Sequence, residues 1–215
     1  DLLTCNLSDN IKNLLIETDL YKSNFNITDK GEFFINRLSA YGVTVSYLST
    51  FNRISDLLKN NYEFIWKRKN GYELHVHRDL NVWGSGGALK YYFEKIDNII
   101  INTFNKNIDE QPRGIIDIGC GDGTFLKHVY DVILKNTIRG KNIKKYPVKL
   151  IGVDINKAAR IISRKTLNSH NIDNIIINGN ISDPESLSNE LQNNFGEDVK
   201  NFLSCRTFLD HNRIF

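Results

Sequence analysis

The sequence predicts an α/β fold in which a parallel sheet follows a helical N-terminal region. Three observations lead to this prediction. Residues 114–118 form a short apolar strand that runs into a glycine-rich turn and then an amphipathic helix. Two more apolar strands follow, at residues 148–153 and 174–178. A strand, a glycine turn and a helix in that order make the first half of a nucleotide-binding βαβ unit.

The composition excludes several classes of protein. The chain has 215 residues, 40% hydrophobic and 25% charged, which suits one or two compact domains. No apolar run reaches the roughly 18–20 residues that span a bilayer, so we expect no membrane partner. A net charge of +3 makes a nucleic-acid partner improbable on charge alone. The three cysteines are far apart in the sequence, which favours a reducing cytoplasm over a disulfide framework.

Residues 1–77 predict a helical region that ends in a β-hairpin. Apolar residues recur at helical spacing in three segments, the last of them over residues 48–58. Polar residues suited to capping precede the first two segments, namely Ser8 or Asp9 and Thr28 or Asp29. Many aromatic side chains lie in this region. They indicate either a small packed core or a lid over a neighbouring site.

The hairpin prediction rests on the pair Asn70-Gly71, which tolerates the positive φ angles of a tight turn. Residues 62–66 and 72–77 flank this pair and carry aromatic and apolar side chains. His75 and His77 would then point to the same face of one strand. Such a pair either contributes to a metal site or forms an ordinary polar strand face.

Residues 84–88 place three glycines around a serine, just before a helix predicted over Leu89–Phe104. We expect a flexible loop at a helix N-terminus, where free N–H groups and the helix dipole attract a carboxylate or a phosphate. The alternative is a turn that links two domains. Within the longer stretch Arg78–Ala88, the candidate ligand-binding residues are Arg78, Ser85, Gly86 and Gly87.

The glycine turn after the first strand has the pattern D-x-G-x-G-x-G, from Asp117 to Gly123. Glycines at alternate positions let the backbone bend sharply and approach a ligand closely. Asp154 ends the next strand, 31 residues after Gly123, where a carboxylate can hold both hydroxyls of a ribose. Its third glycine, Gly123, follows the second by two residues and not by three as in G-x-G-x-x-G, so the turn has no pyrophosphate-binding third glycine in the right register. It therefore suits an adenosine with a zwitterionic tail better than NAD.

The segment Asp117–Phe125 resembles the first motif of S-adenosylmethionine-dependent methyltransferases with the Rossmann-like fold, and Asp154 matches their ribose-binding acid. The resemblance implies that Gly119, Cys120, Gly121 and Gly123 contact the cofactor around its methionine moiety. It also implies that Asp117 supports the turn or binds the cofactor amino group.

The same resemblance places the adenine beside Ile155 and Asn156. An aspartate after the third strand usually meets the adenine amino group in this superfamily, and here Asn180 occupies that position. Asp183 lies close by but can instead cap a helix that starts at Pro184. We expect strands to begin at 114, 148, 174 and 201. Residues 78–215 thus predict a Rossmann-like class I methyltransferase core, truncated after its fourth strand.

A narrower resemblance covers residues 75–215. Five segments carry it, in this order: His77–Ala88, Gln111–Gly114, Ile138–Gly140, Asn156–Ala159 and Phe208–Arg213. Through these segments the sequence is similar to the methyltransferase domain in loading modules of polyketide synthases of the saxitoxin and apratoxin type. The resemblance implies C-methylation of malonyl carried by the phosphopantetheine of an acyl carrier protein. It also implies a mononuclear Fe²⁺ or Mn²⁺, an adjacent GNAT-like decarboxylase domain in the same polypeptide, and a helical lid at residues 1–77.

His211 and Asp210 are the candidate catalytic residues. They follow the predicted fourth strand, at the carboxyl edge of the sheet where ligands of open α/β folds bind. Imidazole suits iron and manganese sites with mixed ligands, so His211 is the predicted metal ligand. The alternative is that His211 is a structural histidine or contacts the substrate. Asp210 would orient His211, coordinate the metal or contact the cofactor amino group.

Two other functions stay open at this point. The chain could methylate a nucleic acid or a protein, or it could be a non-catalytic docking module with a cofactor fold. A basic stretch offers a surface for an RNA or an acidic carrier protein, although a solvated loop is the simpler interpretation. This stretch comprises Lys135, Arg139, Lys141, Lys144, Lys145 and Lys149.

Overall fold

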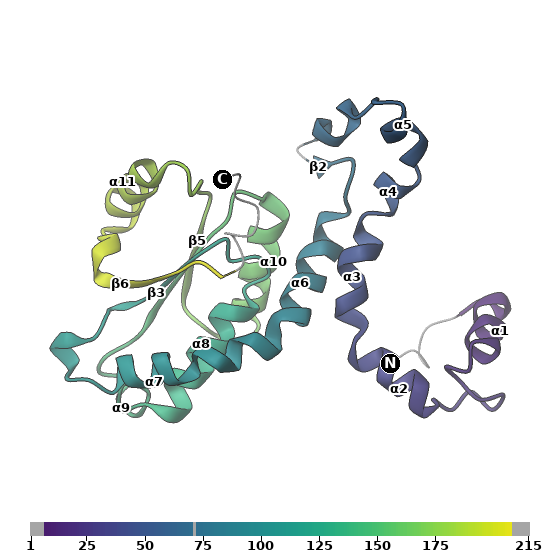
Figure 1. Cartoon of the computed structure of the whole chain (residues 1–215). Helices are drawn as coiled ribbons and strands as arrows, with labels where there is room; N and C mark the ends of the chain where they lie inside the picture. Colours follow the sequence, from purple (N-terminus) through teal and green to yellow (C-terminus); the bar gives the residue numbers. More distant parts are fainter. Residues whose placement is uncertain (1–6, 71, 208–215) are drawn as a thin grey trace.

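The computed structural model describes residues 7–70 and 72–207. Figure 1 shows an α/β part on one side and an N-terminal helical part on the other, joined where helices α3 and α6 pack together. The helices are α1 (Asp9–Glu17), α2 (Asp29–Asn36), α3 (Leu38–Ser46), α4 (Leu48–Phe51), α5 (Ile54–Leu58), α6 (Arg78–Phe93), α7 (Asp97–Phe104), α8 (Thr124–Asn136), α9 (Ile138–Lys141), α10 (Lys157–Asn168) and α11 (Pro184–Phe195). The strands are β1 (Arg68–Lys69), β2 (Tyr72–Glu73), β3 (Gly114–Ile118), β4 (Lys149–Val153), β5 (Asn174–Ile177) and β6 (Phe202–Cys205).

The α/β part is built on a parallel sheet whose strands lie in the order β5-β4-β3-β6. Gly114 at the start of β3 pairs with Lys149 on one side and with Phe202 on the other. The order reverses at β3, since the chain adds β4 and β5 outward and then returns to place β6 on the other side. Open α/β sheets bind ligands outside the carboxyl ends of their strands at such a reversal. The predicted Rossmann-like α/β fold is confirmed.

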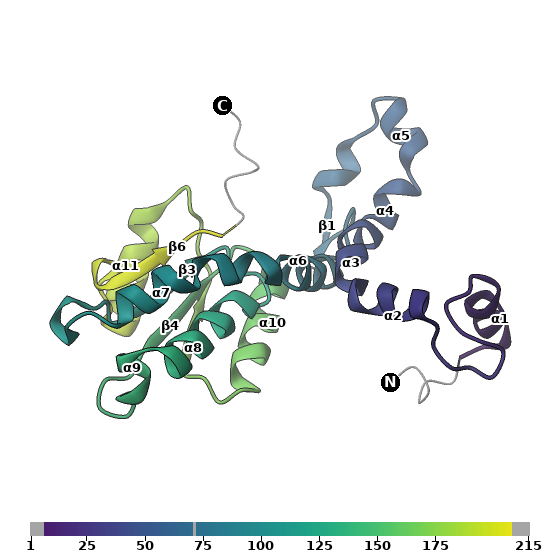
Figure 2. The ribbon, with the colours of Figure 1, turned by 60° about the horizontal axis from the view of Figure 1, so that its bottom comes forward.

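Helices cover both faces of this sheet, which explains why its strands are mainly apolar (Figure 2). Successive strand residues point to opposite faces. Thus Ile115 and Leu150 pack with α6, α7, α8 and α10, whereas Ile116 and Ile151 pack against Leu187 and its neighbours on α11. All four of these strand residues are fully buried. Apolar burial on two faces makes the sheet the main core of the chain.

Helix α6 runs through the segment predicted as a glycine loop, so that prediction is wrong. The helix predicted over Leu89–Phe104 is found as the end of α6 and as α7, with a 3₁₀ helix over Glu94–Ile96 between them. Glycine is a poor helix former, but here it allows two helices to touch. A Cβ atom built on Gly84 would lie 2.7 Å from the backbone nitrogen of Val43 on α3. One built on Gly42 would lie 2.9 Å from the Trp83 ring. Packing against α3 therefore stabilises a helix that the local sequence disfavours.

The N-terminal helices match the prediction in part. Thr28 caps α2 by accepting a hydrogen bond from the Gly31 backbone N–H at 3.0 Å, as predicted. Ser8 is the N-cap residue of α1, without a side-chain hydrogen bond. The predicted third helix over residues 48–58 is instead two short helices, because the chain leaves helical geometry at Arg53, between α4 and α5.

The hairpin is smaller than predicted. Asn70 has the expected positive φ of 53°, but the paired strands are only β1 and β2, and Glu63–Trp66 forms a 3₁₀ helix. His75 and His77 lie beyond the strands, so the prediction that they share a strand face is wrong. His77 caps α6, its Nδ1 accepting from the Leu80 N–H at 3.4 Å.

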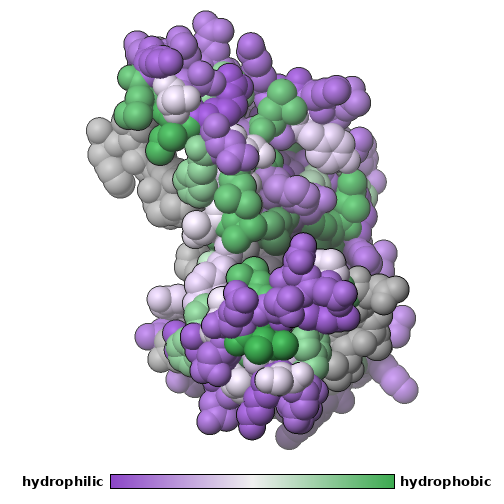
Figure 3. Space-filling view, turned by 90° about the vertical axis from the view of Figure 1, so that its right-hand side faces the viewer, coloured by the Kyte–Doolittle hydropathy of each residue, from purple (hydrophilic) through white to green (hydrophobic). Residues whose placement is uncertain are grey.

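The surface of the N-terminal part carries many apolar side chains. In Figure 3 they gather between its upper and lower portions. Phe33, Leu38, Leu48 and Trp66 are all about half exposed or more. In the part of the chain that the structure describes, no helix has the length and apolarity needed to cross a bilayer.

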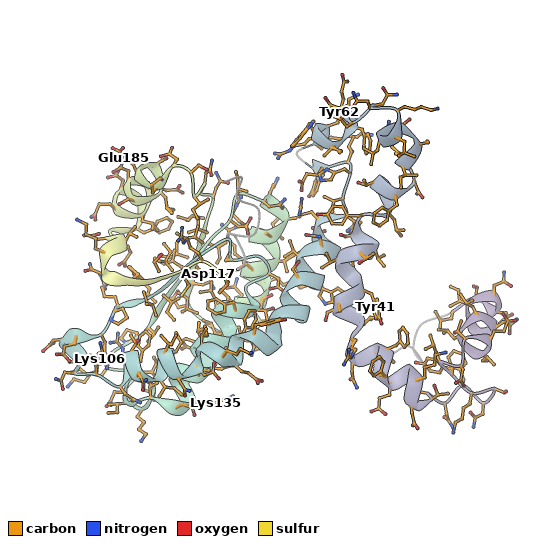
Figure 4. The ribbon with its side chains drawn as sticks, in the orientation of Figure 1. Tyr41, Tyr62, Lys106, Asp117, Lys135 and Glu185 are labelled. Carbon is orange, nitrogen blue, oxygen red and sulfur yellow. The ribbon has the colours of Figure 1, made fainter. Side chains whose placement is uncertain are left out.

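The basic stretch is less available than its sequence indicates. Arg139 is buried, and its guanidinium donates to the backbone oxygens of Tyr146 and Pro147 at 2.6 and 2.9 Å. Lys149 forms an ion pair with the buried carboxylate of Glu197. These two cations therefore make contacts within the fold, which leaves them less available to bind a partner. Lys135 lies at the end of α8 away from Asp117 (Figure 4).

Candidate cofactor site at the carboxyl edge of the sheet

The glycine turn lies directly after β3 and is held against the end of β4. The backbone N–H groups of Gly119 and Cys120 donate to the Val153 carbonyl at 2.7 and 3.0 Å. Gly121 and Gly123 have φ angles of +55° and +79°, which strain any residue with a Cβ atom. A Cβ on Gly121 would meet no described atom closer than 3.9 Å. The turn therefore leaves open space beside its backbone, as a ligand cradle requires.

Asp154 connects the end of β4 to this turn. Its Oδ2 accepts from the Gly121 N–H at 3.1 Å, and its Oδ1 accepts from the Asn156 N–H at 2.8 Å. Burial raises the pKa of its carboxyl, while these two hydrogen bonds and the nearby Arg160 lower it. A carboxylate oxygen can accept more than one hydrogen bond. Asp154 is thus fixed in place and still able to accept two ribose hydroxyls.

Asp117 lies beneath the turn and is 1% exposed (Figure 4). The Thr207 hydroxyl lies 3.5 Å from its Oδ1, whereas its buried Oδ2 has no hydrogen-bond partner in the described residues. Burial, with the neighbouring charge of Asp154, raises the pKa of Asp117 to about 8. A buried oxygen without a partner is costly and calls for an explanation. A cationic ligand in the cradle would supply the missing partner.

A small pocket of about 100 Å³ opens beside Asp154. The predicted contacts Ile155 and Asn180 lie on its wall, with Gly119 at its base. Ile155 is 67% exposed, so its apolar face is free to cover a flat ring. Asp183 caps α11 by accepting from the Ser186 N–H at 3.1 Å, which resolves the alternative in favour of capping. Asn180 Oδ1 accepts from the Ser182 N–H at 3.0 Å, and its Nδ2 donates to no group in the described residues, so Asn180 stays the predicted adenine contact.

Helix α6 brings part of its glycine-rich stretch to the turn. A Cβ atom on Gly86 would lie 2.2 Å from Oδ2 of the buried Asp122, so the helix backbone lies against this carboxylate. Gly87 instead faces Ser39 on α3, where a Cβ would approach the serine Cβ to 2.5 Å. Ser85, which precedes Gly86, is half-buried. Of these three predicted residues, Gly86 is the one that the structure places beside the turn.

Three other predicted residues have partners of their own. The Cys120 side chain is buried in the core, with its Sγ 3.8 Å from Ser163 Oγ. Burial raises the pKa of its thiol. A ligand in the cradle would therefore meet the backbone of Cys120 and not its side chain. Arg78 forms a bidentate ion pair with Glu73, at 2.6 Å for each hydrogen bond. Asn156 caps α10 and donates from its Nδ2 to Glu73 Oε2 at 3.1 Å.

Glu73, Asp122 and Thr207 are site residues that the sequence analysis missed. Asn156 before Lys157-Ala158 is recognisable as a helix cap from sequence. No local signal reveals Glu73, because its partner Asn156 is 83 residues away.

The predicted metal ligand His211 and its neighbour Asp210 lie outside the described residues. Among the residues that are described, no three His, Cys, Asp or Glu side chains are close enough together to hold a metal ion.

Comparison with known families gives two matches. Residues 73–215, about two-thirds of the chain, match the family described as the AprA MT2-like domain. This chain belongs to that family. Residues 3–61 match the AprA winged helix domain. A search of curated proteins found no match. The predicted resemblance to the apratoxin-type methyltransferase domain is therefore confirmed.

The AprA MT2-like domain is a methyltransferase domain, and this implies S-adenosylmethionine as its cofactor. The residues present fit that cofactor, which carries a sulfonium and an ammonium group. Three carboxyl groups border the cradle, those of Asp117, Asp122 and Asp154, and one of them has a buried oxygen to spare. A cluster of acids next to open backbone space is the electrostatic complement of such a cation.

Proposed function

We propose that this chain transfers the methyl group of S-adenosylmethionine to C2 of a malonyl group carried on an acyl carrier protein. The observation that carries the cofactor half of the proposal is the buried Oδ2 of Asp117 at the positive-φ turn, which has no hydrogen-bond partner among residues 7–70 and 72–207. The malonyl half is supported by the membership of the AprA MT2-like family and by the five segments shared with loading-module methyltransferases.

The chemistry needs positioning more than it needs a reactive side chain. When bound, the cofactor would supply an electrophilic methyl group to malonyl C2. The C2 proton would pass to a base in solution, and the electron pair left on C2 would form the C–C bond as the S–CH₃ bond breaks, with S-adenosylhomocysteine as the second product. Asp154 would fix the ribose, and the spare oxygen of Asp117 would accept from the cofactor amino group. These two contacts fix the orientation of the methyl group, which accounts for much of the rate gain when two reactants are aligned.

The proposal includes a mononuclear Fe²⁺ or Mn²⁺ with His211 as a ligand and Asp210 as the residue that orients it. Such an ion would act as a Lewis acid on the malonyl oxygens and stabilise the charge left when the C2 proton departs. The support is the resemblance, together with the place of both residues in the sequence, shortly after β6, a strand parallel to β3.

We also propose the division into a lid at residues 1–77 and a catalytic core at 78–215, with a GNAT-like decarboxylase domain in the same polypeptide. The two family matches leave a junction between residues 61 and 73, close to this boundary. The hydrogen bond from Asn156 to Glu73 joins the predicted lid to the carboxyl edge of the sheet, which supports a lid there.

The test is the intact mass of malonyl-loaded carrier protein after incubation with the chain, S-adenosylmethionine and Fe²⁺ or Mn²⁺. We expect the gain of one methyl group or more, and its loss with D154A. Methylation of RNA or protein without a divalent ion, and none of malonyl, would contradict the proposed substrate. An absence of cofactor binding by calorimetry would instead identify a non-catalytic module.

A further inference from the structure

A single carboxylate joins the hairpin to the loop after β4. Glu73 is the last residue of β2, and its side chain is only 16% exposed. Its Oε1 accepts from Arg78 Nη2 at 2.6 Å, and its Oε2 accepts from Arg78 Nε at 2.6 Å and from Asn156 Nδ2 at 3.1 Å. The arginine lowers the pKa of Glu73, and Glu73 raises the pKa of Arg78, so both groups are charged.

Arg78 is itself held from several directions. Its Nη1 donates to Asn81 Oδ1 at 3.1 Å, and Asn81 Nδ2 donates to Ser46 Oγ at 3.1 Å. The Tyr47 hydroxyl also interacts with the guanidinium. Because α3 and α6 supply these groups, the ion pair lies on a rigid support formed by two packed helices. Glu73 therefore presents its Oε2 to Asn156 in a fixed position.

Asn156 transmits this contact to the cradle. Its amide is oriented in two directions, since Oδ1 caps α10 by accepting from the N–H groups of Ala158 and Ala159, and Nδ2 donates to Glu73. Its backbone N–H donates to Asp154 Oδ1, and Asp154 Oδ2 accepts from Gly121. A continuous series of hydrogen bonds thus runs from the hairpin to the glycine turn.

We propose that Glu73 is a positioning residue, which holds the loop 154–156 in the geometry that binds the ribose of S-adenosylmethionine. The proposal rests on the proposed function, because it takes Asp154 as the ribose-binding acid. Charge-assisted hydrogen bonds of this kind are short and directional, so they fix geometry as well as adding stability. The hairpin of the N-terminal part then sets the cofactor affinity of the core.

The first test compares E73Q with E63Q, a matched substitution of an exposed residue of the same region. E73Q keeps the side-chain volume but loses the negative charge. We expect the Kd for S-adenosylmethionine, measured by calorimetry, to rise about 10-fold in E73Q, as for the loss of one charged hydrogen bond, and to stay unchanged in E63Q. An unchanged Kd in E73Q would overturn the proposal.

A double-mutant cycle distinguishes positioning from general stabilisation. N156S keeps a helix-capping oxygen but removes the amide that reaches Glu73. If Glu73 acts through Asn156, E73Q has little further effect on the Kd in the N156S background. The full effect of E73Q in that background would contradict the proposal, even if both variants have the melting temperature of the parent chain.

Amide hydrogen exchange of the ligand-free chain separates this proposal from the proposed function. E73Q should raise the exchange rates of residues 154–159 and leave those of β3 unchanged, whether or not the chain binds the cofactor. Equal rates in E73Q and the parent chain would overturn the positioning role. Failure of the parent chain to bind the cofactor would bear on the proposed function alone.

Discussion

Asp117 and Asp154 are neighbouring carboxyl groups with different surroundings. Asp154 accepts two backbone hydrogen bonds, whereas Asp117 has one weak contact and a buried oxygen without a partner. Asp117 is also the more deeply buried of the two. Asp154 is pre-organised for a neutral sugar, while Asp117 is best satisfied by a positively charged group. Under the proposed function, the two acids would divide the recognition of a cationic nucleoside between them.

The raised pKa of Asp117 predicts a pH dependence of stability. Its folded-state pKa of about 8 exceeds the ordinary value of 3.8, so the folded chain holds this proton more tightly than the unfolded chain. The contribution of Asp117 to the free energy of unfolding is then complete below about pH 4 and is lost as the pH rises toward 8. Between pH 5 and pH 8 the free energy of unfolding of the ligand-free parent chain should fall by about 4 kcal/mol more than that of D117N.

Urea denaturation at the two pH values measures this difference. Asp122 and Asp154 also have raised pKa values, so D117N should keep part of the decline. An equal decline in the parent chain and in D117N would show that Asp117 ionises at its ordinary pKa in the folded chain.

At the scale of elements, α6 connects the two parts of the chain. It packs on α3 through Gly84 and Gly42, and it reaches the glycine turn through Gly86. It begins at Arg78, the partner of Glu73. One helix therefore supports both the hairpin contact and the cradle, and its glycines serve helix packing where the sequence had indicated a ligand-binding loop.

The substitution G84A tests this role by the sign of its effect. In a solvent-exposed helix, alanine is more stable than glycine by about 1 kcal/mol. In the crossing of α3 and α6, the new methyl group would lie 2.7 Å from Val43 N, so we expect G84A to lose about 2 kcal/mol of stability instead. Chemical denaturation compares it with N98A on the exposed surface of α7. Stabilisation by G84A would mean that the helices do not touch there.

For the whole molecule, the two ends of the sheet have different tasks. The carboxyl ends hold Asp117, Asp154 and the glycine turn. At the amino ends, the buried Glu197 forms ion pairs with Lys149 at the start of β4 and with Arg113 before β3. Glu197 thus ties the segment after α11 to two central strands. The Glu197 ion pairs and the proposed cofactor contacts thus lie at opposite edges of one sheet.

This separation predicts variants that change stability alone. In E197Q the cations of Lys149 and Arg113 lose their ion-pair partner but are exposed enough to be solvated by water. We therefore expect the free energy of unfolding to fall by only about 2 kcal/mol. K149M leaves the buried Glu197 with Arg113 as its remaining ion-pair partner among the described residues, and should cost about 3 kcal/mol or more. Both should keep the parent Kd for S-adenosylmethionine. A weaker Kd in either variant, at a temperature where it is folded, would show that the two edges are coupled.

The local sequence was enough to predict the four strands of the parallel sheet, the glycine turn, the acid after β4 and the caps at Thr28 and Asp183. Periodicity, turn chemistry and capping act over a few residues, so no distant partner is needed to recognise them. Tertiary structure decided what depends on distant partners. Packing against α3 turned a predicted glycine loop into α6, and burial took Arg139 out of the basic surface. The contact of Glu73 with Asn156 joins residues 83 positions apart, so only folding brings that carboxylate to the cofactor edge.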